Sequence, residues 1–255
     1  MASVDAVRLD DAHPQRRGIS LARACLIVLL VAVVVRVLAL GGTSLVVEND
    51  GIDYLVSAET TWKLQPIFIS PFRTPGYPAI LALCFWLMGQ SGEAVMIVQH
   101  ALGALMAVLI TRLAARWVPP AFAIVPGLLV AIDPTLLLFG SVMQTESVSM
   151  FLFVLIVSLA LADTRRLLVT AAALGCVLAF ANLVRPAFIV VAPFTVLALA
   201  SRPALRIPHR VGIVAVAILA FSLTVLPWLA FNRERGIKGF SAGAASTLWV
   251  SLLSL

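Results

Sequence analysis

Long runs of apolar residues, separated by short polar or proline-containing breaks, dominate the chain. Most of them approach the roughly 20 residues that an α-helix needs to cross about 30 Å of hydrocarbon. The pattern therefore predicts about seven transmembrane helices, at about 24–40, 93–111, 120–141, 147–162, 167–184, 187–200 and 211–231. The run at 187–200 is short for this role, so it needs an untilted path, local membrane thinning or shielding by its neighbours.

One further apolar run, at 77–90, is too short to cross. Its 14 residues are typical of an interfacial or re-entrant helix. Basic residues test this interpretation, because they concentrate in cytoplasmic loops. If 77–90 stays at one face, the basic residues outside the spans divide as eleven inside and six outside; if it crosses, they divide as eight and nine. The first arrangement is favoured, with the N-terminus in the cytoplasm and the C-terminal tail outside.

The N-terminal segment does not resemble a cleaved signal peptide. Residues 1–23 carry four arginines, and the apolar run after them is too long for a signal and lacks a small-residue cleavage site. We therefore expect a cytoplasmic tail over 1–23 and a membrane module over 24–231 that includes an external loop at 42–92. An external tail over 232–255 completes the expected organisation.

Composition agrees with this reading of the pattern. Hydrophobic residues make up 62% of the 255 positions and charged residues 12%, against roughly 45–50% and about 25% in soluble domains. A soluble globule is excluded, and the fold class is an all-α polytopic membrane protein. The net charge of +6 comes mostly from arginines, whose positions in short loops indicate sidedness rather than nucleic-acid binding. The three cysteines lack metal-ligand spacing.

The expected external loop holds the first candidate chemistry. Asp50 and Asp53 come soon after the first span, next to Tyr54. A carboxylate at the membrane boundary can act as general base on an acceptor hydroxyl, although a solvated acidic turn has the same composition. Arg73 opens the segment Arg-Thr-Pro-Gly-Tyr-Pro, which includes Tyr77. An arginine there can bind a phosphate through two hydrogen bonds or anchor to lipid headgroups.

Two more charged residues lie at span boundaries on the same predicted face. Glu146 begins the fourth span, where an acidic residue also interacts favourably with the helix dipole and where Thr145 or Ser147 can cap the helix. Arg185 lies between two apolar segments, with no acid near it in sequence. An ionisable residue in such a position is a functional candidate, and snorkelling to the interface is the competing explanation.

Inside the spans, two polar residues have structural explanations. Arg36 lies within the first span, where it can snorkel outward or pair with Asp133. His100 is expected to be a hydrogen-bonded packing residue, because no second histidine or carboxylate stands at helical spacing from it.

The order of these short motifs is more specific than any one of them. After the first span come Asp-x-x-x-Tyr at 50–54, the proline-rich segment at 73–78 and, two spans later, an acidic residue in an outer turn. Arg185-Pro186 follows, and the chain leaves the last span through Pro-Trp at 227–228 and Asn-Arg at 232–233. Over about residues 20–250 this order resembles the GT-C glycosyltransferases, specifically the bacterial relatives of protein O-mannosyltransferases and lipid A aminoarabinose transferases.

The resemblance implies a multi-pass protein of the bacterial plasma membrane that uses a polyprenyl-phosphate sugar donor. The sugar would pass, with inversion, to a hydroxyl or amine of a glycan, lipid or protein acceptor at the outer face. It implies a catalytic role for Asp50, with Asp53 as the alternative, and an accompanying aromatic role for Tyr54. The matched positions in the outer turns are Glu146, which would position the acceptor or a divalent metal, and Arg185, which would face the donor phosphate.

Two departures from the family pattern stand beside this match. Some relatives carry a Glu-Lys pair where this chain has Arg73-Thr74, so phosphate contacts are expected to be distributed differently, with Arg73 and Tyr77 as further substrate-binding candidates. Relatives usually continue through more spans, whereas this sequence stops within the apolar stretch 248–255. The tail is therefore expected to be truncated before further spans.

Two other functions remain open at this point. A lipid-carrier flippase or small-molecule transporter also needs polar groups among apolar helices, but such sites usually lie near the bilayer midplane between repeated halves. Here the ionisable residues collect at one predicted face, and no repeat is evident. A non-catalytic subunit of an envelope-assembly complex would instead retain the scaffold and dispense with the chemistry.

Overall fold

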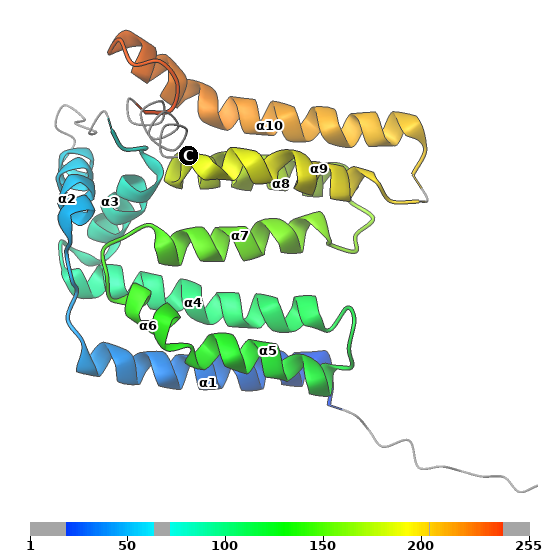
Figure 1. Ribbon diagram of the computed structural model, residues 1–255, viewed down its shortest axis with the longest axis horizontal. Helices are drawn as coiled ribbons and strands as arrows, with labels where there is room; N and C mark the ends of the chain where they lie inside the picture. Colours follow the sequence, from blue (N-terminus) through cyan, green and yellow to red (C-terminus); the bar gives the residue numbers. More distant parts are fainter. Residues whose placement is uncertain (1–18, 64–71, 204, 242–255) are drawn as a thin grey trace, which may run out of the picture.

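The apolar runs fold into helices that lie side by side with alternating direction (Figure 1). This computed structural model describes residues 19–63, 72–203 and 205–241. Most of the expected N-terminal tail and the apolar stretch 248–255 lie outside the described residues. The elements, in chain order, are α1 (Leu21–Gly42), α2 (Asn49–Trp62), α3 (Gly76–Met88), α4 (Gly92–Ala114), α5 (Pro120–Ile132), α6 (Pro134–Gly140), α7 (Glu146–Ala160), α8 (Leu167–Val184), the 3₁₀ helix η1 (Pro186–Val190), α9 (Val191–Ala200) and α10 (Ile207–Glu234).

Four of these helices, α1, α4, α8 and α10, are long and apolar enough to cross a membrane. The bent pair α5 and α6 qualifies as a fifth crossing if it is counted as one span. The shorter apolar helices α7 and η1–α9 run alongside the long ones (Figure 1). The all-α membrane fold is confirmed, and the number of seven spans stays a prediction.

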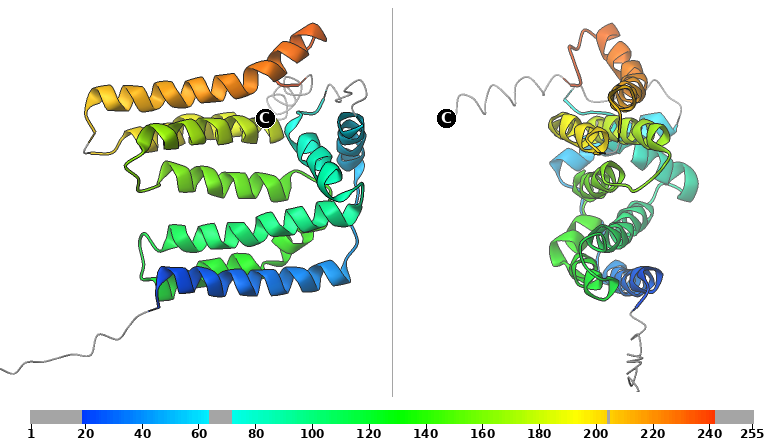
Figure 2. Two further views of the ribbon diagram at one scale, coloured as in Figure 1. Left: turned by 180° about the vertical axis from the view of Figure 1, so that it is seen from behind. Right: turned by 90° about the vertical axis from the view of Figure 1, so that its right-hand side faces the viewer.

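Because successive helices alternate in direction, the connections between them gather at two different ends of the bundle. Helices α2 and α3 lie at one end, beside the turns at 43–48 and 141–145 (Figures 1 and 2). We call this the α2–α3 end. The turns at 115–119 and 161–166, and the residues 201–203 and 205–206 between α9 and α10, lie at the other end, which we call the arginine end. The run predicted to stay at one face is α3, which lies beside α2 and across the end of the bundle.

The predicted single span at 120–141 is broken in its second half. Pro134 lacks a backbone N–H, so the helix cannot continue through it with regular hydrogen bonds. Asp133 instead accepts a hydrogen bond from the amide of Leu136 at 2.9 Å and caps α6, which bends away from α5 by 49°.

This break explains the position of Arg36 and decides against one of the two alternatives for it. Arg36 is buried and donates to the carbonyl oxygen of Ala131 at 2.9 Å, near the C-terminal end of α5. A cation at the end of a helix interacts favourably with the unsatisfied carbonyls and the helix dipole. The described part of the chain contains no ion pair between Arg36 and Asp133, so this one of the two alternatives offered for Arg36 does not occur.

Helix α3 is held at its first turn by unusually close packing against α8. A Cβ atom on Gly76 would lie 2.6 Å from the backbone nitrogen of Val184, so no larger residue fits without displacing one helix. The Thr74 hydroxyl adds a hydrogen bond of 3.2 Å to the carbonyl oxygen of Val184. Small residues and hydroxyl groups commonly join helices in membranes in this way. Much of the segment at 73–78 therefore serves to dock α3, which leaves Arg73 beside α2.

Candidate functional site

The first part of the candidate site lies on one face of α2. Asp50, Asp53 and Tyr54 are spaced three and four residues apart, so their side chains are neighbours on that face. Asp50 lies in the first turn of the helix, where a negative charge interacts favourably with the dipole. The two carboxylates form part of a helix rather than of an acidic turn, and each is about half exposed.

Arg73 joins both carboxylates from the segment before α3. It forms ion pairs with Asp50 and, at 3.3 Å, with Asp53, and its guanidinium lies 5.5 Å from the centre of the Tyr54 ring. Burial alone would lower the pKa of Arg73, but Tyr54 and the two carboxylates raise it overall. The guanidinium therefore stays charged, and its side chain remains 28% exposed to an incoming ligand.

Two tyrosines, Tyr54 and Tyr77, connect α2 to α3 behind these charges. Their rings meet edge to face at 5.0 Å between centres. Burial raises the pKa of Tyr54, so this hydroxyl stays protonated. Tyr77 is fully buried and donates a hydrogen bond of 2.8 Å to Gln99 of α4. Tyr77 therefore lies beneath the site surface.

A second ion pair lies beside the first cluster. Glu146, the first residue of α7, is 3.4 Å from Arg185, which follows α8. Neither suggested cap acts on the α7 terminus: Thr145 makes no capping bond, and Ser147 donates to the carbonyl oxygen of Phe139 at 2.7 Å.

The two ion-paired clusters lie next to each other, because Thr74, which follows Arg73, donates a hydrogen bond of 3.2 Å to the carbonyl oxygen of Val184, which precedes Arg185. The charges of Arg73, Asp50, Glu146 and Arg185 all act on the Tyr54 hydroxyl. The structure thus brings together the seven candidate residues, Asp50, Asp53, Tyr54, Arg73, Tyr77, Glu146 and Arg185.

Below Arg185 the helices leave an open apolar groove of about 440 Å³. Arg185 contributes a charged group to its lining, and Phe153 lies seven residues beyond Glu146 along α7, about 10 Å into the bundle. Besides these two side chains, the lining consists of Met106, Ile110, Val130, Ser149, Met150, Val154, Ala187, Phe188 and Val191. A ligand with one charged end and a long apolar remainder matches this surface.

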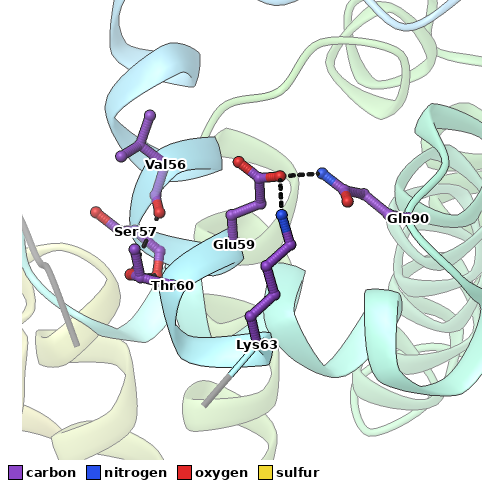
Figure 3. Close-up of polar contacts among 6 residues, drawn as sticks. All are labelled: Val56, Ser57, Glu59, Thr60, Lys63 and Gln90. Atoms are coloured by element: carbon purple, nitrogen blue, oxygen red, sulfur yellow. Dashed lines mark hydrogen bonds and ion pairs between the residues drawn. The ribbon is translucent and has the colours of Figure 1, made fainter. Parts of the chain in front are cut away.

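The C-terminal half of α2 is fixed by a separate polar cluster (Figure 3). Glu59 accepts hydrogen bonds of 2.9 Å from both Lys63 and Gln90, and Gln90 lies just after α3. The hydrogen bond from Gln90 and then that from Lys63 lower the pKa of Glu59. The cluster joins α2 to the turn between α3 and α4, about two and a half helical turns from Asp50.

Sequence reasoning missed one residue that supports the site, Gln99. It is 2% exposed and bonds to Tyr77 and to the turn at 140–142. The signal in the sequence was a polar pair, Gln99-His100, inside an apolar span. His100 is buried against Ser141 at 3.3 Å, in line with the packing role expected for it.

No group of three or more histidine, cysteine, aspartate or glutamate side chains that could hold a metal ion occurs within residues 19–63, 72–203 and 205–241. What these residues do present is a set of carboxylates and arginines at one end of an apolar helical bundle, above a groove. This arrangement is that of an all-α membrane protein with a polar cluster at one end of its helical bundle.

Comparison with known families identifies the class. Residues 72–228 match the family model of the dolichyl-phosphate-mannose-protein mannosyltransferases. The chain belongs to this family. No curated protein and no solved structure was found to match it. The suspected GT-C relationship is thereby confirmed, and membership implies a membrane glycosyltransferase that uses a polyprenyl-phosphate sugar donor.

Proposed function

We propose that the chain transfers a sugar from a polyprenyl-phosphate donor to an acceptor hydroxyl or amine, with inversion at the anomeric carbon. The observation that carries this proposal is the apolar groove that ends at Arg185. An isoprenoid tail matches the apolar lining, and a phosphate matches the guanidinium, which binds phosphate through two hydrogen bonds. The sugar would then lie above Arg185, among the carboxylates of the α2–α3 end.

The residues of the site have distinct roles in this reaction. Asp50 accepts the acceptor proton while the acceptor atom attacks the anomeric carbon from the face opposite the phosphate. The bond between the anomeric carbon and the phosphate oxygen breaks, and the phosphate leaves with the bonding electrons. Arg185 stabilises the charge that develops on the phosphate. Glu146 holds Arg185 in place and positions the acceptor.

Arg73 controls whether Asp50 is available. In the ligand-free site its guanidinium is paired with Asp50 and Asp53. When the donor binds, Arg73 would move from these carboxylates to the donor phosphate and become a second phosphate-binding cation beside Arg185. Arg73 would then contribute to charge stabilisation, and Asp50 would become free to accept a proton. Asp53 is the alternative base, because it shares the same arginine.

The test is sugar transfer by purified protein in lipid nanodiscs, with polyprenyl-phosphate mannose and a panel of other polyprenyl-phosphate hexoses and pentoses. Asp50→Asn should lower the transfer rate about 10²- to 10⁴-fold, which is the usual contribution of a positioned base. Asp163→Asn is the matched control, since Asp163 is exposed in a turn at the arginine end. The control should retain the wild-type rate.

Three outcomes would contradict parts of the proposal. Wild-type transfer in Asp50→Asn, with loss in Asp53→Asn, would move the base to Asp53. Flipping of the lipid phosphate across the membrane without sugar transfer would support a transporter. Transfer that needs a second protein and is insensitive to Asp50→Asn would support a non-catalytic subunit.

We further propose the orientation and organisation that the arginine distribution favours. The α2–α3 end would lie outside the bacterial plasma membrane and the arginine end in the cytoplasm, with a membrane module over about 24–231. Labelling of single cysteines placed at positions 53 and 165, in a variant without native cysteines, tests this. Outside-only labelling at 53 and inside-only labelling at 165 are expected, and the reverse pattern would overturn the orientation.

A further inference from the structure

A buried amide in α4 connects three segments of the candidate site. Gln99 is 2% exposed, and all its described hydrogen bonds cross to other elements. Its carbonyl oxygen accepts from the Tyr77 hydroxyl at 2.8 Å. Its amide nitrogen donates to the carbonyl oxygens of Gly140 at 3.1 Å and Val142 at 3.0 Å. The single side chain therefore bridges α3 and the turn that precedes Glu146.

The turn held by Gln99 also supports the start of α2. Val46 and Val142 form a β-bridge, with hydrogen bonds of 2.8 Å from the Val46 amide to Ser141 and from the Met143 amide to Val46. A Cβ atom on Gly51 would lie 3.0 Å from the Met143 carbonyl oxygen, so α2 packs directly on this turn. The turn at 140–143 thus touches the segment that carries Asp50.

The bonds of Gln99 are hard to replace at this position. Carbonyl groups in a turn lack the partners that a helix supplies, and buried ones need a hydrogen-bond donor from elsewhere in the protein. An apolar side chain at position 99 would leave the Tyr77 hydroxyl and the Gly140 carbonyl without the partner that Gln99 supplies, whereas the Val142 carbonyl would keep the amide of Gln144 at 2.9 Å. The two groups that lose their partner would move to find a new one.

We propose that Gln99 is a positioning residue, which sets the distance between the α2 carboxylates and the Glu146–Arg185 pair through Tyr77 and the turn at 140–142. This inference rests on the proposed function, because it assigns Gln99 to that site. It adds a residue that touches neither substrate nor reacting atoms. A displacement of about 1 Å in a catalytic site can lower the rate about 10²-fold, so a modest shift would be visible in the kinetics.

The first experiment is a double-mutant cycle on sugar transfer in nanodiscs, with Gln99→Met and Tyr77→Phe. Gln99→Met should lower kcat about 30- to 100-fold, and Tyr77→Phe about 3- to 10-fold, with donor KM changed less than about 3-fold. The double variant should be no slower than Gln99→Met, because the Tyr77 hydroxyl then has no partner to lose. Ser158→Ala is the control, since that hydroxyl bonds only within α7, to Val154 at 2.7 Å.

The second experiment does not depend on activity. The chain has two tyrosines, so Tyr54→Phe leaves Tyr77 as the sole site for fluorotyrosine labelling. The fluorine NMR signal of this sample should shift when Gln99→Met is added, because the phenol loses its acceptor. Ser158→Ala should leave the signal in place.

The outcomes separate this inference from the proposed function. Additive rate effects of Gln99→Met and Tyr77→Phe, or an unchanged fluorine signal, would overturn the role of Gln99 even if Asp50→Asn is inactive. If the wild-type chain transfers no sugar, the proposed function fails, and the fluorine signal alone decides whether Gln99 holds Tyr77. If Gln99→Met does not fold, Tyr77→Phe must still lower kcat, and a wild-type rate in that variant contradicts the inference.

Discussion

The two ends of the bundle carry similar charged residues in different arrangements. At the α2–α3 end, Arg73 and Arg185 each face a carboxylate. The arginine end has the opposite character: Asp163 is the one acidic residue in its described turns. Its arginines in the described part of the chain are Arg23, Arg112, Arg116, Arg165, Arg166, Arg202, Arg206 and Arg210.

The bonding of these arginines shows why the ends differ. Arg202 binds the carbonyl oxygen of Ala162, and Arg210 binds those of Leu205 and Arg202, so both close turns between helices. The other arginines of this end form no ion pair with a carboxylate in the described part of the chain. By contrast, Arg73 and Arg185 are each paired with carboxylates. The α2–α3 end is therefore distinguished by arginines that are paired with carboxylates, not by a larger number of arginines, and it is the end where we expect the catalytic site.

The strongest test of this comparison removes one arginine from each end. Arg185→Gln should lower sugar transfer about 10²- to 10³-fold, because the developing phosphate charge loses its principal partner. Arg165→Gln should leave transfer within about 2-fold of wild type, since surface charges without partners contribute little. Initial rates with a polyprenyl-phosphate sugar in nanodiscs measure both.

Equal losses in the two variants would show that the arginines act through the fold or through lipid binding. A binding measurement with the polyprenyl phosphate alone, without a sugar, separates an effect on binding from an effect on the transfer rate. Arg185→Gln should weaken this binding and leave the thermal unfolding temperature close to that of wild type, because the Arg185 side chain is 51% exposed.

A second test compares close packing at the two ends. Gly76→Ala would place a Cβ atom 2.6 Å from α8 backbone atoms, whereas the nearest atom to a Cβ on Gly212, in α10, is a Leu168 side-chain carbon at 3.8 Å. Gly76→Ala should destabilise the protein by about 1–3 kcal/mol and lower transfer about 10-fold, since α3 must move. Gly212→Ala should be neutral or stabilising by up to about 1 kcal/mol.

Thermal unfolding in detergent and transfer rates check this pair of variants. A Gly76→Ala protein with wild-type stability and rate would mean that α3 adjusts freely against α8. The position of Arg73 would then not depend on the Gly76 contact.

Much of the fold was predictable because membrane helices are constrained by length and charge. The run at 77–90 is too short to span, and the basic residues concentrate on one side of the membrane only if this run stays at one face. Helix α3 does lie across one end of the bundle. The candidate site was predictable as a set because its members all follow or begin apolar runs. Charged groups at those boundaries converge when the helices alternate in direction.

Other features depended on contacts that a single sequence does not encode locally. The segment at 49–62 reads as a polar loop, and it becomes α2 because Tyr54 packs on Tyr77 and Arg73 pairs with its carboxylates. The sequence left open whether Arg36 snorkels or pairs with Asp133, and neither alternative included the Ala131 carbonyl, which becomes available because the helix breaks at Pro134. Gln99 was missed since its partners lie 22 to 43 residues away along the chain.

The smallest expected effect concerns the polar cluster of Glu59, Lys63 and Gln90, which fixes α2 away from the site (Figure 3). The pKa of Glu59 lies below its ordinary value of 4.5, because Gln90 and Lys63 bind the ionised form. A lowered pKa in the folded state means that the contribution to stability is fully present above the unfolded-state value. It is lost as the pH falls through the folded-state value.

Glu59→Gln removes this pH-dependent contribution and should change little else, because the side chain is 35% exposed and about two and a half turns from Asp50. At neutral pH the variant should unfold about 1 °C or less below wild type, and transfer should be unaffected. Thermal unfolding followed from about pH 7 to pH 3 should bring the two proteins together at the acid end, since wild-type Glu59 is then protonated as well. If the difference in unfolding temperature between the two proteins grew toward low pH, the pKa of Glu59 would be raised rather than lowered by folding, and the folded state would favour the neutral carboxyl group.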